Sequence, residues 1–311
     1  MPVEQSFPIV NFPQGAVILE PDNRPSECFY VIRSGKVKVS DTPERVMVNG
    51  AECLESGDFF PIVSTLAQKP NRLTAVAETD VTLTAVSKDN FTAFIEENLP
   101  VCTKILKHLS SRLRILNEEL AYGEKEVPPT ADLARLYDFG KYYLRRNLFR
   151  SAYCAFYQYL KYCPEGENVE SARKYLRRFS SYAHGIKFDY YEKNIIREYP
   201  IDSAIFFEYE PSDGMYIIRS GAIKITKIAN DKGVVLAVLR PGDILGEMGL
   251  IDSKPRSATA IAYTDCEIMA IARTAYLPIL KNGADITDKI CVTLSKRICD
   301  MHDRIYKDKP L

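Results

Sequence analysis

The residues with the most specific chemistry lie between positions 242 and 262, in the sequence GDILGEMGLIDSKPRSATAIA. The guanidinium fork of Arg256 can engage the oxygens of a phosphate-type anion, and the Ser257 hydroxyl and the Ala258 amide can add hydrogen-bond donors. Gly246–Leu250 is expected to open a helix toward the same anion, because free amides and the positive end of a helix dipole favour negative charge. Glycine also permits a close approach of the backbone to a ligand. Together these residues predict an anion cradle.

This stretch resembles the phosphate-binding cassette of cyclic nucleotide-binding domains, the family that includes the catabolite activator proteins and the regulatory subunits of cyclic-AMP-dependent protein kinase. GEMGL at 246–250 and PRSA at 255–258 match the two halves of the family pattern at the family spacing. The resemblance implies that Arg256 holds a cyclic phosphate and that Glu247, which can only accept hydrogen bonds, takes the ribose 2′-hydroxyl. The residues expected to bind the ligand are Leu245, Gly246, Glu247, Met248, Gly249, Leu250, Arg256, Ser257 and Ala258.

Glu247 and Arg256 also have a simpler interpretation. A glutamate and an arginine at this separation would more often form a surface or half-buried ion pair that stabilises the fold by about 0–1 kcal/mol. The sequence around them favours the pocket. RSGAIK at 219–224 and RPGD at 240–243 extend the resemblance over almost the whole of residues 200–306.

An internal repeat organises the chain. YVIRSGKVKV at 30–39 recurs as YIIRSGAIKI at 216–225, and AVAETDVTLTAVS from Ala75 recurs as AIAYTDCEIMAIA from Ala260. Each copy begins with short β-branched or aromatic segments separated by Gly, Pro, Asn and Asp. This pattern predicts a small barrel or sandwich of about eight strands.

The predicted fold class is mixed β and α, with two jelly-roll barrels of the cyclic nucleotide-binding type, each followed by a C-terminal helix. Apolar residues recur at the helical period near 101–120 and 286–306 and predict these two helices. The expected domains are a degenerate cyclic nucleotide-binding-like domain at 1–121, a tetratricopeptide-like helical linker at 128–185, and a cyclic nucleotide-binding domain at 186–311.

The first copy of the repeat lacks the key functional groups of the second. In order, Gly246, Glu247, Arg256 and Ser257 are matched by Pro61, Ile62, Asn71 and Arg72. Pro61 has no amide to donate, and Ile62 would place a hydrocarbon where a ribose hydroxyl should bond. Arg72 comes one residue late, which on a strand reverses the side it faces. No ordinary cyclic nucleotide is expected here, and a different ligand or a purely structural role stays open.

The middle of the chain has a different composition. Residues 122–187 hold ten of the nineteen tyrosines and twelve basic against seven acidic side chains. Eight positions match the tetratricopeptide pattern, namely Leu136, Phe139, Gly140, Tyr143, Ala152, Phe156, Tyr159 and Pro164. Gly140 and Ala152 would let two antiparallel helices approach closely. Since one repeat cannot bury a continuous core, the unit must pack on a barrel, on the helix expected after Glu170, or on another subunit.

The C-terminal helix is expected to report ligand binding. The resemblance implies that this helix closes as a lid, with Ile305 or Tyr306 near the base, where Tyr306 could stack on a purine. The alternative is that Tyr306 marks the end of an ordinary helix. The two apolar stripes could also form a homodimer seam.

Composition limits the partners. The 41 basic residues balance 41 acidic ones, so no net field attracts nucleic acid or an anionic membrane. The chain shows no secretory start and no membrane-length apolar run, so a cytoplasmic location is expected. No metal site, catalytic motif or nucleophile pattern is visible, and an enzyme is not expected. Nothing long enough for a helix-turn-helix follows Ile305, so DNA binding is not expected either.

The sequence therefore predicts a non-catalytic cyclic nucleotide receptor that relays a conformational change to a protein partner through residues 128–185. Cyclic AMP is favoured over cyclic GMP, although the hydroxyl of Ser257 can also favour guanine. The alternative is an interaction scaffold in which the barrels are structural and the tyrosine-rich, basic middle docks another protein. The sequence does not identify the partner or the oligomeric state.

Overall fold

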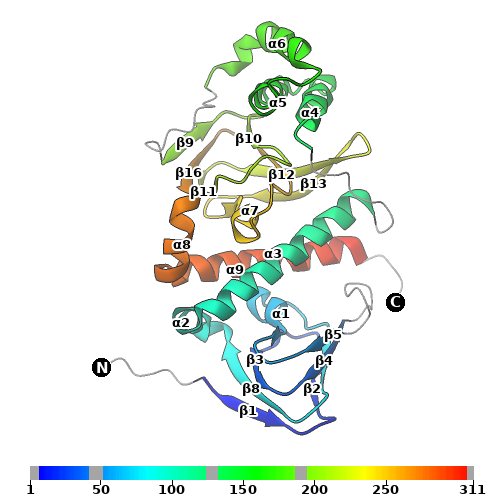
Figure 1. The fold of residues 1–311 in the computed structure, drawn as a ribbon, viewed down its shortest axis with the longest axis vertical. Helices are drawn as coiled ribbons and strands as arrows, with labels where there is room; N and C mark the ends of the chain where they lie inside the picture. Colours follow the sequence, from blue (N-terminus) through cyan, green and yellow to red (C-terminus); the bar gives the residue numbers. More distant parts are fainter. Residues whose placement is uncertain (1–6, 42–51, 124–131, 186–194, 307–311) are drawn as a thin grey trace. The chain divides into compact units, whose positions relative to one another are not determined.

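The structure is a computed structural model of the 311-residue chain. It describes residues 7–41, 52–123, 132–185 and 195–306 (Figure 1). The chain divides into two compact units: unit 1 comprises Met1–Leu113 and Leu277–Leu311, and unit 2 comprises Arg114–Tyr276. The boundaries expected at residues 128 and 186 lie outside the described residues.

Unit 1 contains the first barrel, built from two four-stranded antiparallel sheets with the orders β1-β8-β3-β6 and β2-β7-β4-β5. Side chains alternate between the two faces of each strand, and the inward-facing ones, including Ile32, Val37 and Leu83, form the core. The strands are β1 (Ile9–Phe12), β2 (Val17–Leu19), β3 (Cys28–Ser34), β4 (Val37–Asp41), β5 (Glu52–Leu54), β6 (Phe59–Phe60), β7 (Leu73–Ala77) and β8 (Val81–Ser87).

The helices of unit 1 include one from the far end of the chain. The C-terminal helix α9 packs against α1 and α2, and its apolar stripe, including Ile290, Leu294 and Ile298, is buried (Figure 1). The boundaries between the units fall inside α3 and α8. The helices and the short turn before α2 are α1 (Ile62–Ala67), η1 (Lys88–Asn90), α2 (Phe91–Glu97), α3 (Leu99–Tyr122), α8 (Arg273–Asn282) and α9 (Ala284–Tyr306).

This placement differs from the expected third domain at 186–311, since residues 277–306 belong to the unit of the first barrel. The helix itself forms over the predicted range. Its period only requires that one face be covered, and α1 and α2 supply that cover.

Unit 2 contains the second barrel, again two four-stranded antiparallel sheets, with the orders β10-β15-β12-β13 and β14-β11-β16-β9. The four sheets of the chain agree with the predicted pair of jelly-roll barrels. Its elements are β9 (Ile196–Tyr199), β10 (Ala204–Phe206), β11 (Gly214–Ser220), β12 (Ile223–Ala229), β13 (Lys232–Leu239), β14 (Ile244–Leu245), α7 (Met248–Ile251), β15 (Thr259–Ala262) and β16 (Cys266–Ala272).

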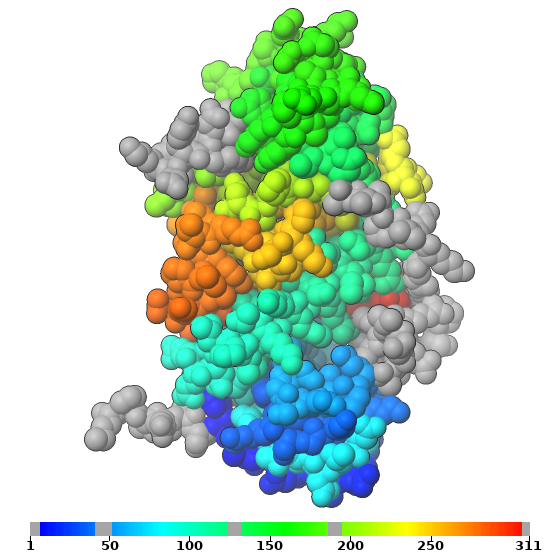
Figure 2. Space-filling model, viewed as in Figure 1, coloured from blue at the N-terminus to red at the C-terminus, as the bar shows by residue number. Residues whose placement is uncertain are grey.

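Three helices and a short 3₁₀ turn form a layer on the second barrel, coloured green in Figures 1 and 2. They are α4 (Arg135–Arg145), α5 (Phe149–Tyr162), α6 (Val169–Arg178) and η2 (Ser180–Ala183). A Cβ at Gly140 would lie 2.6 Å from the ring of Phe156, so glycine is what lets α4 and α5 pack this closely. The core of the helices continues into Phe207 and Ile261 of the barrel, and Tyr175 of α6 stacks on Phe156 at 4.6 Å. The pair α4 and α5 therefore packs both on the barrel and on α6.

A buried ion pair lies in the second barrel close to this layer. Lys227 Nζ donates to Glu208 Oε1 at 2.6 Å, and the two side chains are 4% and 2% exposed. Burial raises the pKa of Glu208 and the charge of Lys227 opposes that shift. Such a pair leaves a buried charge without compensation if one partner is removed.

Candidate functional site

The predicted cassette lies at one edge of the second barrel. The chain leaves β14, passes through Gly246, and turns into α7 with Glu247 as its N-cap residue. Gly246 has φ of +79°, a left-handed conformation that glycine adopts without strain. The short helix expected at residues 246–250 therefore starts two residues later and spans Met248–Ile251.

Arg256 is the centre of this site. Its side chain is almost completely buried, and Nη1 donates to the carbonyl oxygen of Gly246 at 2.8 Å while Nη2 donates to Asp213 Oδ1 at 2.8 Å. The guanidinium carbon lies 4.3 Å from the centre of the Phe206 ring, within the range of a cation–π contact. A Cβ at Gly246 would collide with Nη1, so the glycine is required by the arginine. The structure thus brings the two predicted residues into direct contact.

Asp213 was not found from the sequence. It lies just before β11, its side chain is 55% exposed, and it provides the carboxylate that pairs with the buried guanidinium. The sequence signal is weak because Asp213 is 43 residues from Arg256. Because Asp213 is exposed and Arg256 is buried, Asp213 can leave the ion pair at low desolvation cost. An anion from solvent could then take its place on the guanidinium.

Glu210 is a second residue missed by the sequence analysis. Its side chain is buried, and burial raises the pKa of its carboxyl to about 8, with the charge of Arg256 acting in the opposite direction. The backbone joins the same residues, because the amide of Arg256 donates to the carbonyl of Glu210 at 2.9 Å. At neutral pH the raised pKa favours the protonated, neutral form of Glu210 beside Arg256.

Arg114 holds the cassette from the end of α3. Its Nη2 and Nε donate to Asp252 Oδ2 at 2.7 and 3.1 Å, and Nη1 reaches the carbonyl of Pro255 at 3.4 Å. Asp252 is the C-cap of α7, and Pro255 directly precedes Arg256. Arg114 therefore connects the two halves of the cassette, a role that its distant position in the sequence does not reveal.

The remaining predicted residues line or support the cassette. Glu247 is buried at the start of α7, and its carbonyl accepts from the amides of Leu250 and Ile251. Ser257 is partly exposed and its hydroxyl lies 3.7 Å from the sulfur of Met248. Gly249 allows a close approach to Ser212. The side chains that belong to the buried interior of the domain are Leu245, Met248, Leu250 and Ala258.

The two predicted lid residues lie in unit 1. Ile305 is partly buried, and Tyr306 is buried with its ring 4.7 Å from that of His302. Both residues belong to α9, and α9 is part of the same unit as the first barrel. Their role as a lid for a ligand in the second barrel stays a prediction.

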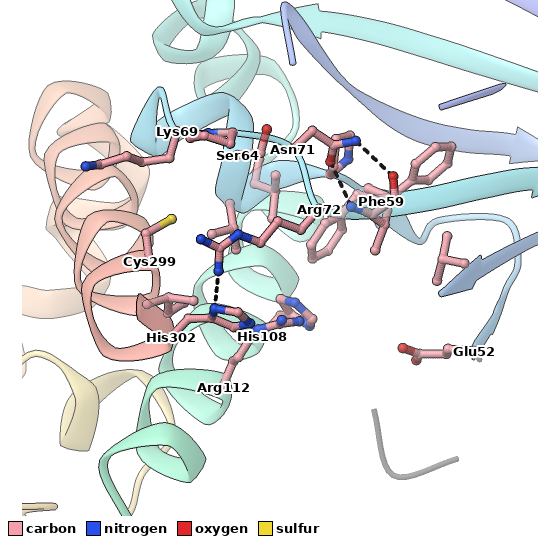
Figure 3. Close-up of a pocket in the computed structure, with 18 of the residues that line it drawn as sticks. Glu52, Phe59, Ser64, Lys69, Asn71, Arg72, His108, Arg112, Cys299 and His302 are labelled. Carbon is pink, nitrogen blue, oxygen red and sulfur yellow. Dashed lines mark hydrogen bonds between the residues drawn. The ribbon is translucent and has the colours of Figure 1, made fainter. Parts of the chain in front are cut away.

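The first barrel uses the corresponding residues differently. Asn71 is buried, and its side-chain amide donates to the carbonyls of Glu20 and Leu73 at 2.7 and 2.8 Å. Ile62 is buried as the first residue of α1. Arg72 points into a cavity toward α9 (Figure 3). At the equivalent positions of the first barrel, Asn71 and Ile62 therefore stabilise the fold, whereas Arg72 contacts α9.

Two further searches bear on the site. Within residues 7–41, 52–123, 132–185 and 195–306, no cluster of three or more His, Cys, Asp or Glu side chains could hold a metal ion. None of the helices in those ranges combines the length and apolar character needed to cross a bilayer.

The family model of the cyclic nucleotide-binding domain matches residues 9–98 and 196–282, more than half of the chain. The cyclic AMP receptor protein of Thermus thermophilus is 30% identical over 33% of this chain and 48% of its own length. The cAMP-dependent protein kinase regulatory subunit of Aspergillus fumigatus is 34% identical over 29% of this chain and 21% of its own length. The chain thus spans about half or less of these relatives.

Solved structures give weaker likenesses. The catabolite activator protein of Thermus thermophilus is 28% identical, covers 35% of this chain and 52% of its own, and has a TM-score of 0.33. The regulatory domain of Toxoplasma gondii PKA with cAMP is 15% identical, covers 91% of this chain and 85% of its own, and has a TM-score of 0.28.

The family match falls on both copies of the internal repeat, and each copy forms a barrel of two antiparallel sheets. The second copy also carries the buried arginine, the left-handed glycine and the glutamate of the cassette. The chain belongs to the cyclic nucleotide-binding domain family and contains two such domains.

Proposed function

We propose that the second domain is a non-catalytic receptor for a cyclic nucleotide, with cyclic AMP as the preferred ligand. The observation that carries the proposal is the buried guanidinium of Arg256, held against Gly246 and opposed by the exposed carboxylate of Asp213. The phosphate would join this guanidinium, and Glu247 would accept the ribose hydroxyl. Relatives named as a cyclic AMP receptor protein and a cAMP-dependent kinase regulatory subunit support the choice of cyclic AMP.

The backbone around Arg256 provides a route for the signal. Tyr209 donates its amide to the carbonyl of Arg256 at 2.9 Å, and Arg256 donates to Glu210. On its other side Tyr209 stacks on Phe139 of α4, and its hydroxyl accepts from Arg135 Nη1 at 2.7 Å. A ligand that shifts Arg256 would therefore move a segment already packed on α4.

The helical layer is the proposed output surface. We assign α4 and α5 to one tetratricopeptide-like repeat, on the basis of their close pairing at Gly140 and Phe156. A protein partner would dock on residues 128–185. Homodimerisation is part of the same proposal, and light scattering with and without cyclic AMP measures it.

Calorimetric titration tests the binding step. Wild-type protein should bind cyclic AMP more tightly than cyclic GMP, and Arg256→Lys should weaken cyclic AMP binding about tenfold or more, because lysine lacks the fork. Arg219→Lys is the matched control, since Arg219 is a half-exposed arginine of the same barrel. The proposal would be refuted if the wild type does not bind cyclic AMP, or if Arg256→Lys binds it as tightly as the wild type and Arg219→Lys do.

A scaffold is the second candidate function. The observation that favours it is the exposed basic surface of α6, formed by Arg173, Lys174, Arg177 and Arg178. Capture of a partner that does not respond to cyclic AMP would support a scaffold over a receptor. The relatives named as transcriptional regulators raise DNA as another partner, and a salt-sensitive mobility shift with duplex DNA measures that.

A further inference from the structure

The first domain contains a cavity of about 290 Å³ at the position of its altered cassette (Figure 3). The residues that line it come from β4 and β5, from the altered cassette, from α3 and from α9, all within unit 1. Much of the wall is apolar, formed by side chains that include Phe59, Ile62, Leu73 and Ile298. A cavity of this kind favours a compact ligand with an apolar body.

The charged side chains that line the cavity include more cations than anions. Arg72, Lys69, Lys104 and Arg112 line it, against the carboxylates of Asp58, Asp303 and Glu52. Lys104 donates to Asp58 Oδ1 at 2.5 Å. The formal charge of these groups leaves an excess of one positive charge, which suits an anion rather than a cation.

Arg72 has a partner that resembles a ligand. Its Nη2 donates to Asp303 Oδ1 at 2.6 Å, and its Nη1 donates to Nδ1 of His302, both on α9. The two charged side chains are 41% and 42% exposed, so an anion from solvent can compete for the guanidinium. A carboxylate on a guanidinium accepts the same two N–H donors that an anionic phosphate ligand would accept.

A cyclic nucleotide does not fit this chemistry. Ile62 stands where the sugar hydroxyl would need an acceptor, and the amide of Asn71 is committed to the backbone. Arg72 faces the cavity from the position that directly follows Asn71 in the chain. The ligand must therefore bring an anion and an apolar body without relying on ribose recognition.

We infer that this cavity binds a small anion of the phosphate class attached to a flat apolar group, with Arg72 as the receptor and Asp303 as the carboxylate that the ligand displaces. Binding then releases the last turns of α9 from Arg72. The inference is independent of nucleotide binding in the second domain, because it uses no residue of that cassette.

A tryptophan reporter tests the inference directly. The chain contains no tryptophan, so Tyr306→Trp provides one unique fluorophore beside His302. The probes are phenyl phosphate, inorganic phosphate and phenol at matched millimolar concentrations. Phenyl phosphate should give a saturable change in fluorescence, and it should bind more tightly than phosphate or phenol alone. No saturable change with phenyl phosphate would overturn the inference.

Two substitutions in the reporter protein distinguish the roles. Arg72→Gln should weaken phenyl phosphate binding about tenfold or more, whereas Asp303→Asn should tighten it severalfold by removing the resident competitor. Arg256→Lys should leave it unchanged, which separates this site from the nucleotide site. If Arg72→Gln does not fold, judged by far-ultraviolet circular dichroism, the Asp303→Asn result decides. Unchanged affinity in Asp303→Asn would refute displacement.

Discussion

The two barrels share the internal repeat and the same strand order, but the residues at matching cassette positions make different contacts. In the second barrel Arg256 is buried, yet its partner Asp213 is exposed and exchangeable. In the first barrel Asn71 occupies the matching position and holds the carbonyls of Glu20 and Leu73. The comparison teaches that the second cassette keeps a guanidinium beside an exposed carboxylate, whereas the asparagine of the first cassette bonds only a neutral amide to backbone carbonyls and provides no charge for an anion.

The buried ion pair of the second barrel should produce the largest effect on stability. Lys227→Met removes the partner of Glu208 and should destabilise unit 2 by about 3–5 kcal/mol. Urea unfolding followed by circular dichroism measures this change. Lys224→Met, on the same strand, should cost less than about 1 kcal/mol because the cation–π contact of Lys224 is with the exposed ring of Tyr263. Equal losses of unfolding free energy in both variants would show that the Lys227–Glu208 pair contributes no more to stability than an ordinary lysine on this strand.

Restoring the missing arginine tests whether the first cassette is dormant or structural. Asn71→Arg removes the hydrogen bonds to Glu20 and Leu73 and should destabilise unit 1 by about 2–4 kcal/mol without creating nucleotide binding. Asn23→Arg, on a nearby exposed residue, should change stability by about 0.5 kcal/mol or less. A stable Asn71→Arg variant that binds cyclic AMP in calorimetry would contradict the comparison.

Two left-handed glycines sharpen the same comparison. Gly246→Ala should cost about 1–2 kcal/mol in backbone strain and should also weaken cyclic AMP binding, because the added Cβ meets Arg256. Gly57→Ala in the first barrel has a similar φ but open space around it, so it should cost the strain alone. Thermal unfolding and calorimetry measure the two effects. Equal cyclic AMP affinity in wild type and Gly246→Ala would show that the collision of the added Cβ with Arg256 does not affect binding.

Glu210 should produce an effect that depends on pH. Its pKa is raised from 4.5 to about 8, so between these values the folded protein keeps a proton that the unfolded chain releases. Its contribution to stability is therefore complete below pH 4.5 and is lost as the pH rises through 8, with a slope of at most about 1.4 kcal/mol per pH unit. Glu210→Gln should flatten this part of the profile in urea unfolding, whereas Glu198→Gln on β9 should not. An unchanged profile would mean that Glu210 is ionised in the fold.

The sequence predicted the parts that depend on local pattern. The two barrels, the order of their elements and the cassette of the second copy follow from a repeat that keeps strand spacing and glycine positions. The close approach of two helices at Gly140 also follows from the helical pattern, and the structure places the ring of Phe156 against this glycine. The sequence further indicated that Pro61, Ile62 and Asn71 could not serve a nucleotide, because residue type alone removes the needed donors and acceptors.

Only the tertiary structure decided which surfaces meet. An apolar stripe on α9 requires a covering surface but does not specify it, and the structure assigns α9 to α1 and α2 of the first barrel rather than to the second domain. Arg114 with Asp252, and Arg72 with Asp303, join residues 138 and 231 positions apart. Charge and periodicity are properties of single segments, whereas the choice of partner depends on packing between segments that folding brings together.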